Sequence, residues 1–371
     1  MSLRFVLISI LLIFLSYDIH RRATIVYDAS SFIQNAKQLL TLESFDRQHG
    51  LKEIIKEVND PAVIMLNKYA INITLNFLCN VEKLKKVHER LLVIVFDDLS
   101  KEIIATSFPH IRVYKFNLPA LESKFKRGEG TYQLFQYFRA ALAAYLIQHT
   151  KEFWMIQCDT IWRQNLFEVL DSKSELKLVG ESSVLLDSEA DSGLLQNMTA
   201  GGYFKVRSNN NSFKLFVHVM QQLENKLVTD NNMMSQYCYS QKSLCKFIPN
   251  SLLSNWRKKI DDKNALPLFL QYDNGESTEH KFTKMAKIGA LFVNLSTYET
   301  KVVQCLKGSN ENLMESINTD FIASESKYQS NSNYWDRFLC FLVDSILSYF
   351  PFTEKIIRSY IYPEFSFILT V

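Results

Sequence analysis

An acidic residue stands after an apolar run, where residues 153–157 lead into Cys158 and Asp159. Placing a carboxylate beside a hydrophobic strand is costly unless a partner balances its charge, and a divalent cation is a natural partner. Asp159 is therefore a candidate ligand of a divalent cation. Cys158 is expected to be a free buried thiol, because a cysteine in such surroundings behaves as a small apolar residue.

Polar residues also follow two other strand-like runs. Residues 62–66 end at Asn67, and residues 91–96 end at Asp97 and Asp98. Ligands of parallel sheets bind beyond the carboxyl ends of the strands, which makes these polar residues candidates for one shared site. A solvated turn is the alternative interpretation of Asp97 and Asp98, and both interpretations stay open.

A glycine pair, Gly201-Gly202, opens the short strand-like stretch 203–207. Glycine is needed where the backbone turns sharply or approaches a ligand closely. The pattern is consistent with a ligand beside these residues and also with a plain turn.

The elements around these residues alternate between strand-like and helix-like segments. Near-continuous apolar runs are typical of strands in a sheet that is covered on both faces. Their alternation with helical spacing predicts an α/β fold with a mostly parallel sheet flanked by helices. No repeat or proline-rich linker is found, so one domain over residues 60–305 is expected. The predicted helices are 71–88, 131–148 and 213–226, and the further predicted strands are 111–116, 153–157, 178–180, 203–207, 247–249, 266–271 and 290–295.

Composition limits the classes of function. A net charge of +3 over 371 residues argues against a general nucleic-acid binder. The hydrophobic fraction of 47% is ample for a folded core.

The N-terminus carries an apolar run, residues 5–17, after Arg4. Its length matches a signal-peptide core and falls short of the roughly 20 residues that a membrane span prefers. An uncleaved signal anchor within residues 1–23, a cleaved signal peptide and a buried helix all stay open. Either a signal anchor or a signal peptide would direct the chain into the secretory lumen. An anchor would also bind the membrane. Residues 24–59 would then form a stem.

Two further features agree with the lumen. The chain has acceptor sequons for N-glycosylation at Asn72, Asn197, Asn210 and Asn294. Its six cysteines are even in number, which permits disulfides. A bridge between Cys238 and Cys245 would close a short loop, and one between Cys79 and Cys305 would span the folded region.

Seven segments together resemble a known family. In chain order they are PAVIMLNKYAINITLNFLCN, GEGTYQLFQYFRAALAAYLIQ, FWMIQCDTIWRQNLF, GGYFKVR, TDNNMMSQYC, CKFIPNSLLSNW and KMAKIGALF. Over roughly residues 60–305 the chain resembles the nematode-expanded nucleotide-diphospho-sugar transferase domain family. The resemblance implies a glycosyltransferase-A fold on a type II membrane protein of the Golgi or endoplasmic reticulum. It also implies transfer of a hexose or pentose from a nucleotide donor to a glycan or glycoprotein.

The resemblance implies a metal-assisted donor site, with Mn²⁺ or Mg²⁺ as the expected ion. Glycosyltransferases of this fold commonly use an Asp-x-Asp tripeptide whose last Asp binds the metal. Gln157 replaces the first Asp here and can hydrogen-bond a ribose or a metal-bound water, but it adds no charge. His280 is implied as a further ligand of the ion on Asp159, with simple exposure in a polar loop as its alternative.

The remaining implied roles concern the acceptor and the donor. Asp230 resembles a catalytic carboxylate, which is a general base if the reaction inverts, and capping of a helix is its alternative. Arg139 suits a bidentate contact with the diphosphate, and an ion pair with an acidic neighbour is its alternative. The complete set of implied donor-binding residues is Asn67, Lys68, Arg139, Gln157, Gly201 and Gly202.

Three functional hypotheses remain at this point, of which a secreted structural or adhesion protein is disfavoured by the polar clusters at the strand ends and by the lack of repeats. The leading one is a glycosyltransferase. The missing first aspartate supports the second, a catalytically inactive lectin-like or partner-binding protein on the same fold. Residues 306–371 lie outside the resemblance and have no predicted role.

Overall fold

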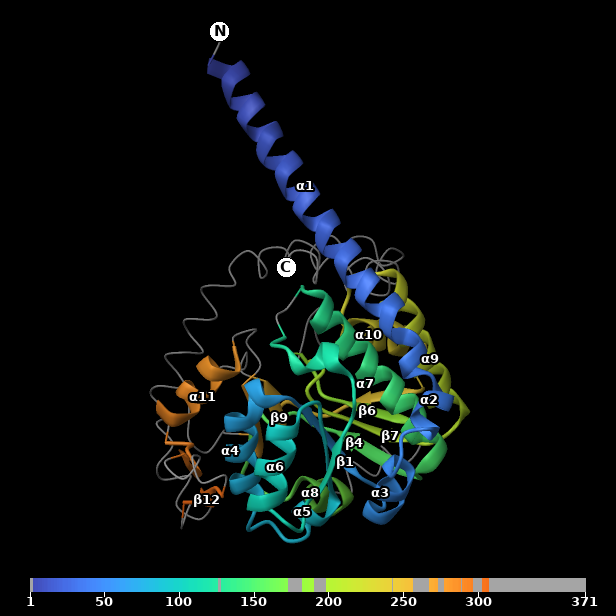
Figure 1. Ribbon diagram of the computed structural model, residues 1–371, viewed down its shortest axis with the longest axis vertical. Coiled ribbons are helices and arrows are strands. Elements are labelled where there is room, and N and C mark those ends of the chain that lie inside the picture. Colours follow the sequence, from blue (N-terminus) through green and yellow to red (C-terminus); the bar gives the residue numbers. More distant parts are fainter. Residues whose placement is uncertain are drawn as a thin grey trace.

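The centre of the molecule is a seven-stranded sheet with helices on both faces (Figure 1). The computed structural model describes residues 3–125, 128–172, 182–189, 198–241, 243–255, 267–272, 277–287, 289–295 and 302–306. The strand order is β3-β2-β1-β4-β7-β6-β8. Strand β7 runs antiparallel to its neighbours β4 and β6, and the other pairs in this sheet are parallel. The strands are β1 (Ala62–Leu66), β2 (Leu91–Val95), β3 (Arg112–Lys115), β4 (Glu152–Met155), β6 (Val184–Leu186), β7 (Phe204–Arg207) and β8 (Cys245–Phe247).

Successive side chains of the central strands enter two separate cores. Ala62 and Ile64 of β1 pack in one core, and Val63 between them packs in the other. This alternation follows from the two-residue period of a strand and explains why both faces of β1 are apolar. One face is covered by α4 (Ile71–Val81) and α6 (Asp98–Ser107), and the other by α7 (Gly130–His149), α9 (Asn210–Asn225) and α10 (Asp230–Ser240).

The N-terminal part joins the second core through its last turns. Helix α1 (Leu3–Ala36) extends away from the body of the molecule (Figure 1), and its Ile33 is buried against the domain. The segment expected as a stem contributes buried side chains, including Phe45 and Leu51. Among the residues that the structure describes, no helix combines the length and apolarity needed to cross a bilayer. The short helices after α1 are η1 (Lys37–Leu40), α2 (Leu42–Asp46) and α3 (Leu51–Val58).

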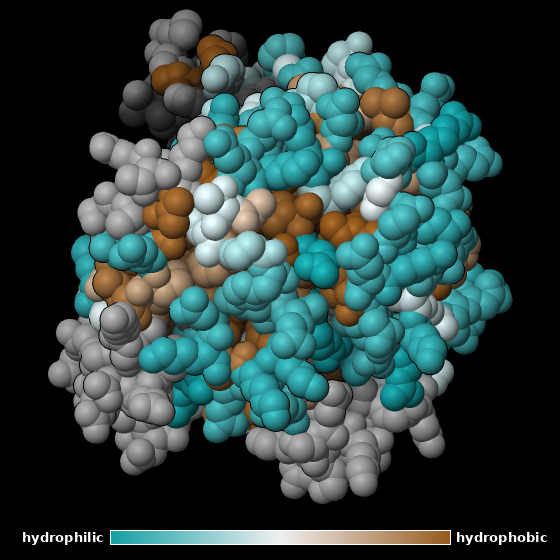
Figure 2. Space-filling view, turned by 60° about the horizontal axis from the view of Figure 1, so that its bottom comes forward, coloured by the Kyte–Doolittle hydropathy of each residue, from teal (hydrophilic) through white to brown (hydrophobic). Residues whose placement is uncertain are grey.

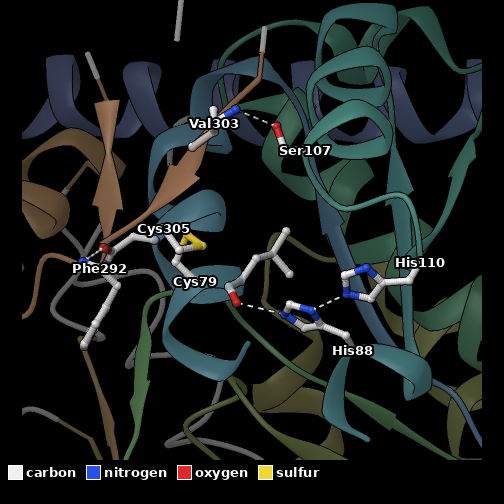
Figure 3. The surroundings of a disulfide bond; sticks show 9 residues. Cys79, His88, Ser107, His110, Phe292, Val303 and Cys305 are labelled. Carbon is white, nitrogen blue, oxygen red and sulfur yellow. Dashed lines mark hydrogen bonds between the residues drawn. A yellow bond between two sulfur atoms is a disulfide. The ribbon is translucent and has the colours of Figure 1, made fainter. Parts of the chain in front are cut away.

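Both predicted disulfides are present. The Cys79–Cys305 bond joins α4 to β12 (Gln304–Cys305), which pairs with β11 (Val293–Asn294) (Figure 3). The Cys238–Cys245 bond joins α10 to β8. Cys158 is a free, buried thiol as predicted, and burial raises the pKa of its side chain to about 12.

The predicted α/β fold with a mostly parallel sheet flanked by helices is confirmed, with differences in detail. The predicted helix 71–88 is two helices, α4 and α5 (Val87–Arg90), because Lys86 adopts a left-handed φ of 60° between them. The predicted strand 290–295 pairs only over the two residues of β11. The predicted strand 178–180 lies outside the described residues.

The remaining elements complete the layers. A three-stranded sheet is formed by β5 (Thr160–Trp162), β10 (Phe269–Gln271) and β9 (Leu253–Asn255). The short helices that connect the layers are η2 (Lys68–Ala70), η3 (Pro119–Glu122), α8 (Leu166–Ser172) and α11 (Thr278–Lys287). The face shown in Figure 2 is mainly hydrophilic, with apolar residues visible between polar ones, which is usual for a domain whose core is closed.

Candidate functional site

Four polar residues and one glycine turn lie at strand ends along the same edge of the main sheet. Leu66 of β1 aligns with Val95 of β2, and Met155 of β4 aligns with Phe204 of β7. Phe204 also aligns with Leu186 of β6. Because β7 runs in the opposite direction, the residues before it share this edge with the residues after the parallel strands. The positions brought to this edge are Asn67, Asp97, Gln157, Asp187 and the Gly201-Gly202 turn.

Asn67 and Asp97 hold the backbone at the ends of β1 and β2. The Asn67 Nδ2 donates to the carbonyls of Leu121 and Ser123 at 2.9 and 2.7 Å. Asp97 is buried and accepts from the Lys68 backbone N–H at 2.7 Å, and its side chain also caps α6. Asp97 is therefore a buried structural residue rather than a solvated turn residue. It binds the backbone of Lys68, whose side chain is exposed at the edge of the sheet.

The Gly201-Gly202 turn favours glycine at both positions. Gly201 has a φ of +82°, a conformation that strains other residues. A Cβ on Gly202 would lie 1.9 Å from the Gln271 Nε2, far inside any allowed contact. The turn therefore brings bare backbone against the end of β10.

The carboxylate of Asp187 organises this turn. Its Oδ1 accepts from the Gly201 N–H at 2.9 Å, and its Oδ2 accepts from the N–H groups of Gly202 and Tyr203 at 2.7 and 2.8 Å. The Thr199 hydroxyl also donates to it at 2.6 Å. Burial raises the pKa of Asp187, and the hydrogen bonds lower it. The effect of burial is larger, so the pKa is about 6.

Arg139 and Asp230 form a buried ion pair beneath the same turn. The Arg139 Nε and Nη2 donate to the two carboxylate oxygens of Asp230 at 2.5 and 2.6 Å. The Arg139 Nη1 donates to the Gly201 carbonyl at 2.7 Å. The two residues are 4% and 2% exposed. Arg139, the predicted donor ligand, and Asp230, the predicted catalytic carboxylate, bind other protein groups in this structure.

Gln157 takes part in a chain of amides at the end of β4. Its Oε1 accepts from the Gln271 Nε2 at 3.1 Å, and its Nε2 lies 3.5 Å from the Gly201 carbonyl. The Tyr203 hydroxyl donates to the Gln157 carbonyl at 3.0 Å. Gln157 thus lies between the glycine turn and β10, as a neutral group where the family motif commonly has a carboxylate.

Asp159 is paired with a lysine. The Lys281 Nζ donates to the Asp159 Oδ2 at 2.7 Å, and the two side chains are 12% and 9% exposed. His280, the neighbour of Lys281 on α11, is exposed, and its backbone N–H donates to the Ser277 hydroxyl at 3.3 Å.

These contacts test whether the site suits a divalent cation. Within the described part of the chain, no group of three or more His, Cys, Asp and Glu side chains is arranged to hold a metal ion. The Asp159 carboxylate already binds an ammonium, and Gln157 adds no charge. The described residues therefore do not fit the expected Mn²⁺ or Mg²⁺ ion on Asp159 and His280, and metal assistance stays a prediction.

The structure brings most of the predicted site residues together. Gly201 contacts both Arg139 and Gln157, and Arg139 contacts Asp230. Sequence reasoning missed Asp187, Gln271 and Lys281. The strand-end rule that selected Asp97 also applies to Asp187 after its short strand, whereas a lysine within a helix carries no such signal.

Comparison with family models gives one match. The sequence profile of the nucleotide-diphospho-sugar transferase family matches residues 86–285, more than half of the 371 residues. No curated protein matches the chain. Similar solved structures include the apo WbbM bifunctional glycosyltransferase, with 14% identity and a TM-score of 0.41. The match covers 60% of this chain and 49% of the WbbM chain, so this chain spans about half of that protein.

Two other solved structures match over nearly their whole length. Apo mouse xyloside xylosyltransferase 1 has 10% identity and a TM-score of 0.41, over 58% of this chain and 98% of that one. The galactosyltransferase LgtC, in complex with donor and acceptor sugar analogs, has 13% identity and a TM-score of 0.39, over 65% of this chain and 100% of that one.

Proposed function

This chain belongs to the nucleotide-diphospho-sugar transferase family, and from that premise we propose that it moves a sugar from a nucleotide-diphosphate donor to a glycan or glycoprotein acceptor. The observation that carries the proposal is the gathering of Asn67, Gln157 and the Gly201-Gly202 turn at one edge of the sheet. Ligands of parallel α/β sheets bind at this edge.

The donor is proposed to lie beside the amides that the glycine turn positions. The bare backbone of the turn packs against Gln271, and Gln271 binds Gln157. The amide of Gln157 is proposed to hydrogen-bond a donor hydroxyl, and the exposed ammonium of Lys68 is proposed to attract the diphosphate.

Arg139 and Asp230 are proposed to position this turn. Both side chains are buried and bound to each other, and Arg139 also binds the Gly201 carbonyl. A role for Asp230 as general base is the competing proposal. The two differ in how Arg139 variants should behave, as set out in the Discussion.

The compartment is proposed to be the lumen of the Golgi or endoplasmic reticulum, with the N-terminal segment as the link to the membrane. Two disulfides support an oxidising environment, where such bonds persist. The sequon residues Asn72 and Asn210 are exposed, as glycosylation needs.

Thermal unfolding of the full chain with a panel of nucleotide sugars, each with and without Mn²⁺, tests the proposal. One donor is expected to raise the Tm, and Asp159→Ala is expected to abolish the shift. Asp98→Ala, which removes an exposed carboxylate after β2, two strands away from β4 in the sheet, is the matched control and should keep it. Circular dichroism checks that each variant is folded.

The alternative is a binding protein without turnover, which the neutral Gln157 favours. It predicts that Asp159→Ala keeps the full biological activity of the protein. No Tm shift with any donor, from folded wild-type protein, would contradict the transferase proposal and leave this alternative.

A further inference from the structure

The Asp159–Lys281 pair has a chemical meaning beyond a surface salt bridge. A nucleoside diphosphate gains negative charge as it leaves, and some positive group must stabilise that charge. After β4, the Lys281 ammonium lies 2.7 Å from the Asp159 carboxylate, so a positively charged side chain is present at the acidic motif.

Helix α11 is fixed so that Lys281 reaches Asp159. The Thr278 hydroxyl donates to the Tyr69 carbonyl at 2.9 Å, which ties the start of α11 to η2 after β1. Met285 near its end is 1% exposed in the core, and α11 lies beside α4 (Figure 1). These contacts hold both ends of α11. The Lys281 side chain between them is 12% exposed.

The segment after α11 adds a second attachment to α4. The Asn76 Nδ2 donates to the Ala290 carbonyl at 3.0 Å, and the Phe292 N–H donates to the Asn76 Oδ1 at 2.7 Å. The Cys79–Cys305 disulfide holds the following strand pair to the same helix. Because these contacts fix α11 from its far end, the Asp159–Lys281 pair is a built feature of the domain.

A divalent cation on Asp159 would compete directly with Lys281. It would displace the ammonium from the carboxylate and leave a nearly buried positive charge beside a doubly charged ion, which is strongly unfavourable. Gln157 offers no second negative charge to offset this cost. The local charge balance thus favours the lysine over the metal.

We propose that Lys281 binds the diphosphate of the donor in place of a metal ion, so that sugar transfer by this protein needs no divalent cation. The inference rests on the proposed function. An ammonium has three N–H donors and can bridge a carboxylate and a phosphate oxygen. Asp159 then orients the ammonium and does not act as a metal ligand.

The transfer step balances with Lys281 in this role. The bond between the anomeric carbon and the β-phosphate oxygen breaks, and its electron pair goes to that oxygen. The acceptor hydroxyl forms the new bond to the anomeric carbon and releases its proton to the medium. The Lys281 ammonium stabilises the added charge on the departing diphosphate and keeps its own protons.

Isothermal titration of the full chain with UDP and with GDP, in EDTA and in Mn²⁺, tests this inference. One nucleotide should bind in EDTA, and Mn²⁺ should change its Kd less than about threefold. Lys281→Met should weaken binding at least about tenfold, as loss of a hydrogen bond to a charged group does. Lys287→Met is the matched control, since Lys287 is an exposed lysine of the same helix, and should bind as the wild type does.

The outcomes separate this inference from the proposed function. Binding that requires Mn²⁺, or that survives Lys281→Met unchanged, overturns the role of Lys281 and leaves the transferase proposal standing. Absence of nucleotide binding in both conditions overturns both. If Lys281→Met does not fold, Mn²⁺ electron paramagnetic resonance on wild-type protein with saturating nucleotide decides. The protein should lower the free-ion signal no further than the same nucleotide does without protein, and an additional stoichiometric loss would contradict the inference.

Discussion

Arg139 and Asp230 lie 91 positions apart in the chain and meet in a two-point ion pair that is almost entirely buried. The pair links the middle of α7 to the first turn of α10, and through the Gly201 carbonyl it also holds the glycine turn. This ion pair thus joins α7 and α10, which are distant in sequence. It also connects both helices to the edge of the sheet where the donor is proposed to bind.

Breaking this pair should destabilise the protein from either side. Arg139→Met or Asp230→Asn leaves a buried polar group without its partner, and each is expected to lower the free energy of unfolding by about 3–5 kcal/mol. The double variant Arg139→Met with Asp230→Leu should recover most of this loss, because it leaves no uncompensated charge. Chemical denaturation with far-ultraviolet circular dichroism measures all three.

The same variants separate positioning from base catalysis at Asp230. A positioning pair predicts that Arg139→Met lowers donor binding as much as Asp230→Asn does. A general base predicts instead that Asp230→Asn binds donor normally but turns over slowly, with Arg139→Met retaining turnover. The measurement is the donor Kd beside the single-turnover rate.

Gly202→Ala should disrupt the turn through its contact with Gln271. The added Cβ would lie 1.9 Å from the Gln271 Nε2, so one of the two groups must move. Overpacking of this kind costs about 1–3 kcal/mol, and donor binding should fall with it. Adding Gln271→Ala makes room for the new methyl group and should restore the unfolding free energy. If the double variant is no more stable than Gly202→Ala, the steric explanation is wrong.

The buried histidine His88 should make stability depend on pH. Burial lowers the pKa of His88 from 6.5 to about 4, with a further lowering from the neighbouring His110 against the raising effect of the Leu78 carbonyl. The Nε2 of His88 donates to that carbonyl, so its Nδ1 accepts from the His110 Nε2 at 2.7 Å (Figure 3). A proton on Nδ1 would remove this acceptor.

The sign of the effect follows from the direction of the shift. The folded pKa is below the unfolded one, so the unfolded state takes up the proton first as the pH falls. Stability is then complete above pH 6.5 and falls by about 3 kcal/mol as the pH approaches 4. His88→Gln should flatten this part of the profile, while the exposed His49→Gln should leave it unchanged. A His88→Gln profile with the same slope as the wild-type profile over this range would contradict the assignment.

The two disulfides should contribute unequally. Cys79 and Cys305 are 226 residues apart, and Cys238 and Cys245 are 7 apart. Loop-closure entropy predicts losses of about 5 and about 2 kcal/mol when each pair is replaced by serine. Denaturation of the two double-serine variants measures the difference. Equal losses would show that loop closure does not dominate.

The sequence predicted those parts of the fold whose signal is local. The apolar runs at 62–66 and 91–96 are buried strands because a strand covered on both faces has no polar positions. The break of the predicted helix at Lys86 depends on a single left-handed residue that no apolar spacing reveals.

The site was predictable where a residue follows a strand. Asn67, Asp97 and Asp159 were found in this way, Gln157 came from the resemblance, and Asp187 obeys the strand-end rule. The partners of these residues were not predictable, because they come from distant segments. Lys281 reaches Asp159 across 122 positions, and Gln271 reaches Gln157 across 114.

The most direct test of the central claim is release of nucleoside diphosphate from nucleotide sugars by the full chain. Enzyme and each donor of a panel are mixed at equal concentration, with and without a glycoprotein acceptor, and the diphosphate is quantified over time. Transfer at this site predicts release from one donor, faster with acceptor, and a large loss of rate in Asp159→Ala. Folded wild-type protein that releases diphosphate from no donor, with or without Mn²⁺, would contradict the account.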